Sequence, residues 1–306
     1  MWLGCSAEDG QPAATHLECR MITSLRGAHE HVKEAIMAII DIDENLIEYD
    51  DVPDAADWLW LMGLHSSGLH EICPILNNHP DFQIGLTSFL LGYVRLMIQP
   101  EIVRESWPNV FNSLILKEVM CADRWKASTL RAVMEAIRLN ANGQPKILGD
   151  GSCYYRYWMP FIQRVFPNSH MLVVYRSNIW DMLASHWFWQ SQAVPETNIP
   201  DQVLLFMSEI CDMLNLRRMY PNNFRSLCVD ELVVDPEMAL TKFYTPLGLP
   251  VESYEYDKLV LPVLGYGIWE KCQPLAELRD CLQRGDRPGW LCEEFADMLR
   301  QDKLEL

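Results

Sequence analysis

The chain has 306 residues, of which 49% are hydrophobic and 22% charged. This is enough to bury one large core or two modest ones, and it excludes a disordered or low-complexity protein. The formal net charge of −17 argues against nonspecific nucleic-acid binding and against docking on an anionic membrane, because both need clustered Lys and Arg. A bound anion would need a locally positive site within a repulsive overall field.

Neither the cysteines nor the N-terminus indicates a secreted or metal-binding protein. The ten cysteines lack the C-x-x-C spacing of zinc sites, and the first residues, MWLGCSAEDG, lack the basic segment and long apolar run of a secretory leader. No 18 consecutive residues are apolar. We therefore expect a cytoplasmic protein with reduced thiols and without membrane insertion, nucleic-acid partner or metal. The sequence leaves the oligomeric state open, and a homo-oligomer is compatible with it.

The chain divides into an N-terminal extension, residues 1–56, and an α/β domain, residues 57–306. In the extension a helical apolar pattern over 22–49 runs into the acidic stretch 41–51, which is typical of a solvated boundary. The domain begins with a buried strand at 58–62, then a short polar loop after Gly63 and an amphipathic helix.

Strands and helices continue to alternate along the domain. Further helices are predicted at 86–97, 110–120, 128–139, 154–165, 203–219, after Asp235-Pro236 and at the C-terminus, and further strands at 146–148, 171–175 and 226–229. This order predicts an α/β fold with a central parallel sheet flanked by helices and joined by right-handed crossovers.

The loop that ends in Ser66-Ser67-Gly68 has the pattern of a phosphate-binding strand, loop and helix. Such a loop directs backbone N–H groups at an anion placed at the helix N-terminus. The Walker pattern is not met, because Leu69 and His70 stand where it needs Lys and Ser or Thr. Two interpretations remain open at this point, an anion-binding loop and an ordinary turn that uses glycine for its positive φ.

Three later segments, taken with this loop and the NNHPDF that follows its helix, resemble the sulfotransferase family. They are FPNSHMLVVYRSNIWDMLAS at 166–185, CVDELVVDPEMALTKFYTPLGLP at 228–250 and GYGIWEK at 265–271. Their order and spacing agree with the family over about 58–271. The resemblance implies a P-loop-NTPase-like sulfotransferase architecture and transfer of a sulfuryl group from 3′-phosphoadenosine 5′-phosphosulfate to a hydroxyl or amine of a small-molecule acceptor, without a metal.

The resemblance also implies a set of residues that bind this cosubstrate. The 5′ phosphosulfate would lie against Ser66, Ser67, Gly68 and Leu69, with His65 and His70 at the two ends of the loop. Arg176 and Ser185 would hold the 3′ phosphate, for which a guanidinium fork is well suited. Gly267 and Trp269 would close over the nucleotide.

The sequence departs from the family at several positions. Ser66 stands where the family has a Lys or Arg that neutralises the transferring group, and Asp150 lies where it often places a Lys or a catalytic His. The interval from Arg176 to Ser185 is one residue longer than usual. The late loop also lacks its preceding basic residue, unless Lys258 or Lys271 substitutes for it.

Three residues are candidates for catalysis. A protonated His65 or His70 would replace the missing Lys, and a neutral imidazole would accept the acceptor's proton. Asp150 is a further candidate base, although its charge would repel the sulfonate. The alternatives are a surface loop residue for one histidine and a capping or packing residue for the other. Aromatic runs at 154–158 and 186–189 fit an acceptor pocket but are more typical of core.

These observations leave three functional hypotheses. The first is a sulfotransferase with a divergent donor loop. The second is a catalytically inactive sulfotransferase-like protein that binds nucleotide or protein. The third is another P-loop-like activity such as a nucleotide kinase, which needs a Lys followed by a magnesium-holding Ser or Thr that this loop lacks. The identity of the acceptor cannot be read from the sequence.

Overall fold

In the computed structural model, the described residues are 47–48, 57–64, 67–86, 125–126, 145–153, 155–193, 198–251, 261 and 265–306. The N-terminal helix and the helices predicted at 110–120 and 128–139 lie outside these ranges. Within them the domain is built around a five-stranded, entirely parallel sheet in the order β3, β5, β2, β6, β7. The predicted α/β fold class with a central parallel sheet is therefore confirmed.

The strands of this sheet are β2 (Asp57–Gly63), β3 (Phe82–Leu86), β5 (Ile147–Gly151), β6 (His170–Tyr175) and β7 (Phe224–Cys228). In the central strand β2, alternate side chains enter two separate cores: Trp58, Trp60 and Met62 lie in one, and Leu59 and Leu61 in the other. A strand buried on both faces is expected of a parallel sheet covered by helices.

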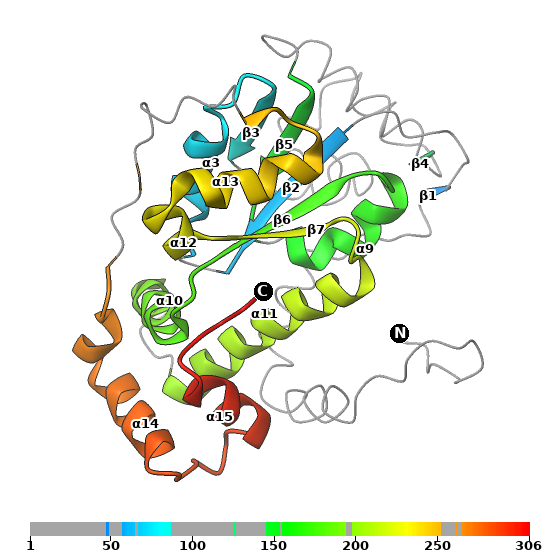
Figure 1. Cartoon of the computed structure of the whole chain (residues 1–306). Helices are drawn as coiled ribbons and strands as arrows, with labels where there is room; N and C mark the ends of the chain where they lie inside the picture. The colour runs from blue at the N-terminus through cyan, green and yellow to red at the C-terminus, as the bar shows by residue number, and fades with distance from the viewer. Residues whose placement is uncertain are drawn as a thin grey trace, which may run out of the picture.

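Helices cover both faces of the sheet, as Figure 1 shows. One face carries α3 (Leu69–Leu76), α12 (Val229–Val234) and α13 (Pro236–Tyr244), followed by the short η2 (Thr245–Leu247). The other face carries α9 (Tyr155–Val165), α10 (Ile179–Ala193) and α11 (Ile199–Met219). The result is a three-layer α/β/α arrangement.

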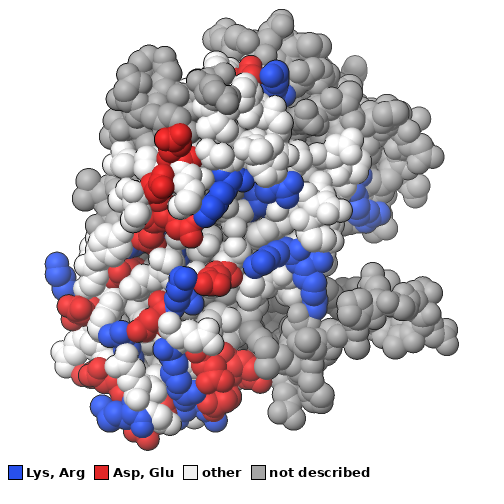
Figure 2. All heavy atoms as spheres, viewed as in Figure 1, with Lys and Arg blue, Asp and Glu red and all other residues white. Residues whose placement is uncertain are grey.

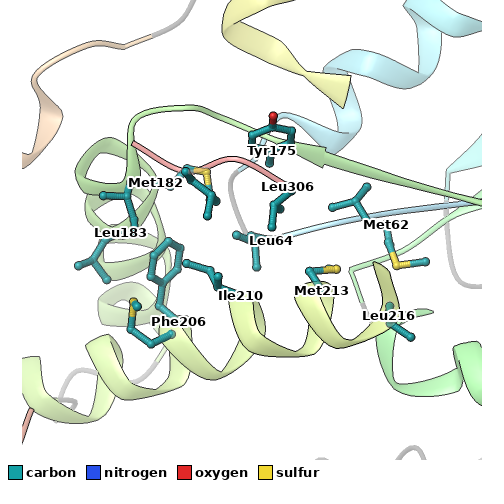
Figure 3. Packing of buried hydrophobic residues seen from close by; sticks show 14 of the residues in the cluster. Met62, Leu64, Tyr175, Met182, Leu183, Phe206, Ile210, Met213, Leu216 and Leu306 are labelled. Carbon is teal, nitrogen blue, oxygen red and sulfur yellow. The ribbon is translucent and has the colours of Figure 1, made fainter. Parts of the chain in front are cut away.

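The ends of α11 follow from its sequence. Asn198 caps its N-terminus by accepting a hydrogen bond from the N–H of Asp201, Pro200 lies in the first turn, and Arg217 and Arg218 lie in the last turn, where cations favour the helix dipole. Its apolar residues, Phe206, Ile210, Met213 and Leu216 among them, face the strands in Figure 3.

The C-terminal part packs against the start of α10. It contains η5 (Ile268–Lys271), α14 (Gln273–Gln283) and α15 (Glu293–Arg300). The residues after α15 run back to the sheet: the N–H of Leu304 donates to the carbonyl of Ser177 at 2.7 Å, and Leu306 enters the core beside Leu64 and Tyr175 (Figure 3). The C-terminal residues thus pack against the carboxyl ends of β2 and β6.

A second, two-stranded sheet pairs β1 (Ile47–Glu48) with β4 (Trp125–Lys126) in parallel. These two strands lie on either side of the boundary predicted after residue 56, which stays a prediction. None of the described helices is both long and apolar enough to cross a membrane. The described cysteines carry free thiols: Cys73, Cys153, Cys211, Cys228, Cys272, Cys281 and Cys292.

Several element boundaries differ from the sequence prediction. Helix α11, predicted from residue 203, begins at Ile199. Leu86, predicted to begin a helix, is the last residue of the edge strand β3. In this five-residue strand, buried Phe82 and Ile84 alternate with exposed Gln83, a pattern too short to be recognised in the sequence. Strand β5 continues past Leu148 to Gly151, because it lies between β2 and β3 and both neighbours pair with it. Strand β7 starts two residues earlier than predicted and ends one residue earlier, at Cys228, because Val229 begins α12.

Candidate functional site

The candidate site lies where β2 and β6 end side by side. These neighbouring strands pair in parallel, yet the chain leaves β2 for α3 on one face of the sheet and leaves β6 for α10 on the other. A crevice opens at the carboxyl ends of two such strands, and α/β proteins bind ligands there. The segments singled out in the sequence, around Ser67 and Arg176, follow these two strands.

The loop after β2 leads directly into the N-terminus of α3. The N–H of Ser67 donates to the carbonyl of Leu64 at 3.0 Å, and Gly68 has φ +93°, a left-handed conformation that glycine adopts without steric cost. Among the described residues no side chain caps α3, so the N–H groups of its first turn point out of the helix. This is the geometry that an anion-binding loop requires.

Ser67 and Leu69 are buried in this loop, whereas His70 is exposed. Among the described residues the hydroxyl of Ser67 has no hydrogen-bond partner, although Ser67 is fully buried. A buried hydroxyl without a partner is uncommon, because it loses the hydrogen bonds that water would make. Leu69 packs into the α3 core. His65 and Ser66 lie outside the described residues, so their predicted roles stay predictions.

Arg176 follows the last residue of β6 and is 4% exposed. Its Nη2 donates to the carbonyl of Gly265 at 3.1 Å and lies 3.8 Å from Oδ2 of Asp181, while its Nε lies 3.6 Å from Oδ1 of Asp230. The ring of Tyr266 lies over the guanidinium, with 5.3 Å between the centroid and Cζ. The guanidinium is therefore enclosed by two carboxylates, a carbonyl and an aromatic ring.

The late glycine loop is tied to Arg176 through Asp181. Gly267, at φ +66°, begins η5, and the N–H groups of Gly267 and Ile268 donate to the two oxygens of Asp181 at 3.2 and 2.9 Å. Trp269 lies near Trp180 and beneath the guanidinium of Arg279, 4.1 Å from Cζ to the ring centroid. The structure thus brings together Arg176 and the 265–269 loop, which are far apart in sequence.

Ser185 and the aromatic run lie further along α10. Ser185 is partly exposed and sits one helical turn after Asp181, on the same side of the helix. His186 is buried in the core, and Phe188 is mostly exposed. Of the other run, Tyr155 and Trp158 are core residues, as the sequence pattern favoured.

Asp150 lies in β5, the neighbour of β2 on the other side, and is 5% exposed. Its Oδ1 accepts the N–H of Gly151 at 3.0 Å, and its Oδ2 accepts the hydroxyl of Tyr155. The thiol of Cys73 on α3 has a pKa raised to about 11, mainly by burial and further by the negative charge of Asp150. Asp150 is thus a buried, hydrogen-bonded carboxylate near α3.

Two residues of the site were not assigned a role from the sequence: Asp181 and Asp230. Both lie in segments that resemble the sulfotransferase family. An acidic residue in the first turn of the helix after Arg176, and another directly after β7, would have been the usable signals. Lys271 is exposed on η5, and Lys258 lies outside the described residues. No group of three or more potential metal ligands occurs within the described ranges.

No protein-family model and no curated protein sequence matches the chain. Its fold matches solved sulfotransferase structures. The sulfotransferase domain from the Synechococcus PCC 7002 olefin synthase aligns with a TM-score of 0.50 and 14% identity, over 83% of this chain and 97% of that domain. The sulfotransferase domain from the curacin biosynthetic pathway gives 0.49 and 14%, over 81% and 98%.

Sulfotransferase STF1 from Mycobacterium tuberculosis H37Rv gives a TM-score of 0.43 at 14% identity, over 88% of each chain. At 14% identity the match to the olefin synthase domain shows the fold alone and leaves donor and acceptor open. The chain therefore has a divergent sulfotransferase-like fold, as the motif order predicted.

Proposed function

We propose that this protein transfers a sulfuryl group from 3′-phosphoadenosine 5′-phosphosulfate to a hydroxyl or amine of a small-molecule acceptor. One observation carries the proposal, which is that two sets of groups meet at the carboxyl ends of the adjacent strands β2 and β6. After β2 lie the uncapped N-terminus of α3 and the buried Ser67 hydroxyl, which has no partner among the described residues. After β6 lies Arg176, which contacts the 265–269 loop. The first strand end supplies N–H and O–H donors, and the second supplies a guanidinium. A nucleotide with two anionic groups needs both.

Each part of the site has a role in this proposal. Ser66, Ser67, Gly68 and Leu69 would receive the 5′ phosphosulfate at the N-terminus of α3. Arg176, with Ser185 one turn beyond Asp181, would bind the 3′ phosphate. Gly267 and Trp269, held to α10 through Asp181, would cover the nucleotide.

The proposed reaction is an in-line displacement at sulfur. The acceptor oxygen or nitrogen forms a bond to sulfur while the bond from sulfur to the 5′ phosphate oxygen breaks, and 3′-phosphoadenosine 5′-phosphate leaves. Donors around the sulfonate stabilise the charge that moves to the leaving oxygen. A base takes the acceptor's proton, and His65, His70 and Asp150 are the candidates. His70 is exposed in the first turn of α3, whereas Asp150 is buried and hydrogen-bonded.

A second candidate function is a catalytically inactive, sulfotransferase-like protein that binds a nucleotide or another protein. Two observations favour it. The described residues of the loop after β2 include no Lys or Arg, and the guanidinium of Arg176 is already flanked by Asp181 and Asp230. In this case the protein would keep the sulfotransferase-like fold but would not catalyse sulfuryl transfer.

The first experiment is calorimetric titration of the purified protein with 3′-phosphoadenosine 5′-phosphate, which needs no knowledge of the acceptor. Arg176→Lys is the matched variant, because it keeps a cation between the carboxylates and removes only the fork. We expect micromolar binding by the native protein and at least about tenfold weaker binding by Arg176→Lys. Arg284→Lys, on the surface at the end of α14, is the control and should bind as the native protein does.

Turnover separates the two candidate functions. Incubation with the 3′-phosphoadenosine 5′-phosphosulfate donor and a panel of hydroxyl and amine acceptors should release the desulfonated nucleotide in proportion to sulfonated product. Binding without any acceptor-dependent release would favour the inactive protein. An absence of binding at millimolar nucleotide would refute the proposed nucleotide site.

A further inference from the structure

The ion pair between Arg176 and Asp230 is incomplete as a hydrogen-bonded pair. Nε of Arg176 and Oδ1 of Asp230 are 3.6 Å apart, and within the described part of the chain neither of these buried atoms has a hydrogen-bond partner. The surface pair of Arg279 and Asp302 shows what a complete fork looks like, since its Nε and Nη2 meet the two oxygens at 3.2 and 2.6 Å. One donor of Arg176 is thus held close to a carboxylate without being bound by it.

The two carboxylates beside Arg176 are held differently. Both oxygens of Asp181 accept backbone N–H groups of the 265–269 loop, and its side chain is fully buried. The Oδ2 of Asp230 accepts the N–H and the hydroxyl of Ser177 at 2.6 and 2.8 Å. Its other oxygen faces the guanidinium, and its side chain is 14% exposed. Both oxygens of Asp181 are therefore used as structural acceptors, whereas Oδ1 of Asp230 accepts no hydrogen bond from the described residues.

Tyr266 covers this pair from the outside. Its ring lies over the guanidinium and is 61% exposed, while Arg176 beneath it is 4% exposed. The pKa of the Tyr266 phenol is raised by desolvation and then by the charge of Asp230, which agrees with a phenol close to that carboxylate. A ligand that reaches Arg176 on this side therefore meets Tyr266 and Asp230 first.

The local charge opposes a dianion. Arg176 contributes one positive charge against the two negative charges of Asp181 and Asp230, within a chain whose formal net charge is −17. On the face shown in Figure 2, acidic side chains gather over the corner between α12 and α13, where Glu231, Asp235 and Glu237 are exposed. Lys242 on α13 pairs with Glu231 at 3.5 Å and offsets part of this charge, and the acidic side chains named here outnumber it.

We propose that Asp230 is a specificity-determining residue of the Arg176 site. Its Oδ1 lies against the guanidinium edge that a nucleotide's 3′ phosphate would take, so that this phosphate binds in competition with the carboxylate. The inference rests on the proposed function. Removing the charge of Asp230 strengthens binding of ligands that carry the 3′ phosphate and leaves ligands without it unchanged, because like charges placed close together oppose binding.

The test compares two nucleotides and three proteins. The nucleotides are 3′-phosphoadenosine 5′-phosphate and adenosine 5′-monophosphate, which differ only in the 3′ phosphate. Asp230→Asn keeps a side-chain oxygen for Ser177 and removes the charge, and Asp286→Asn, on the exposed surface pair with Arg284, is the control for net charge. Calorimetry measures the affinities, and circular dichroism checks that each variant is folded.

We expect Asp230→Asn to bind the bisphosphate at least about tenfold more tightly than the native protein, with no change for the monophosphate and no change in Asp286→Asn. Equal or weaker binding of the bisphosphate by Asp230→Asn, with the native protein binding normally, would overturn the inference and leave the proposed function standing. No binding by either protein would overturn both.

Should Asp230→Asn fail to fold, Asp230→Ser is the second variant, because it keeps a polar group at this position and carries no charge. It should show the same gain for the bisphosphate alone. A gain of equal size for both nucleotides would contradict the inference, since it would indicate a general effect of charge or access.

Discussion

The loops after β2 and β6 end at the same edge of the sheet and are built in opposite ways. After β2, the Ser67 hydroxyl has no partner among the described residues, and none of their side chains caps the first turn of α3. After β6, the carboxylates of Asp181 and Asp230 flank Arg176, and they in turn accept hydrogen bonds from Gly267, Ile268 and Ser177. One loop keeps its donors open, and the other holds its cation between two carboxylates, with Nε of Arg176 left without a hydrogen bond among the described residues.

Because of this difference, substitutions in the two loops should affect ligand binding and stability to different extents. A polar group without a partner costs free energy in the folded state and is retained most simply for a ligand. A buried charge that is matched by neighbours becomes part of the fold, because removing one partner leaves the others uncompensated. Substitutions on the β2 side should therefore change ligand binding more than stability, and those on the β6 side should change both.

The largest expected effect is that of Arg176→Ala. It leaves the carboxylates of Asp181 and Asp230 buried without their cation, so we expect the free energy of unfolding to fall by about 3–5 kcal/mol. Urea denaturation measures this loss. Adding Asp230→Asn to Arg176→Ala should recover part of it, and Arg284→Ala on the exposed surface should change little. If Arg176→Ala were as stable as the native protein, the carboxylates of Asp181 and Asp230 would not need the cation of Arg176 for stability.

The second effect concerns Cys73, the buried thiol of α3 on the β2 side. Burial, with the charge of Asp150, raises its pKa from 9.0 to about 11. The unfolded chain therefore releases this proton at lower pH than the folded protein, and stability falls as pH rises. The contribution is fully present below about pH 9 and is lost by about pH 11, a change of about 3 kcal/mol. Cys73→Ala should show a smaller decrease in urea denaturation at pH 8 to 11.

The smallest change in stability is expected for Ser67→Ala. Its buried hydroxyl has no partner, so its removal should change the free energy of unfolding by less than about 1 kcal/mol while weakening nucleotide binding about tenfold. Ser169 is the matched control, since it is equally buried but bonds to the carbonyl of Phe166 and the amide of Gln163. Ser169→Ala should lose about 1–3 kcal/mol and bind nucleotide normally. Equal stability losses in both variants would indicate that Ser67 is structural.

Much of the fold was predictable because apolar periodicity is a local property. The strands at β2 and β6 and the helices α9, α11 and α13 were found near their observed bounds, since each carries an apolar run or a helical stripe with clear end signals. The edge strand β3 was missed because it is short and includes a glycine. The end of β5 was missed because Gly149 and Gly151 do not favour a strand.

Gly149 shows why tertiary packing decided that strand. A Cβ atom on Gly149 would lie 2.7 Å from the carbonyl oxygen of Leu59 and 3.0 Å from Ile84, so the close approach of β2, β5 and β3 requires glycine there. A residue that weakens an isolated strand is thus needed where strands lie between two neighbours. The sequence pattern alone does not reveal those neighbours.

The candidate site divides in the same way. The sequence by itself determined that a polar, glycine-containing loop joins a buried strand to a helix, and that an arginine ends a later apolar strand. Only the tertiary structure decided that these two strand ends are adjacent and that Asp181 and Asp230 flank Arg176. Strands and turns follow from neighbouring residues, whereas the partners of a buried charge depend on which crossovers bring distant segments together.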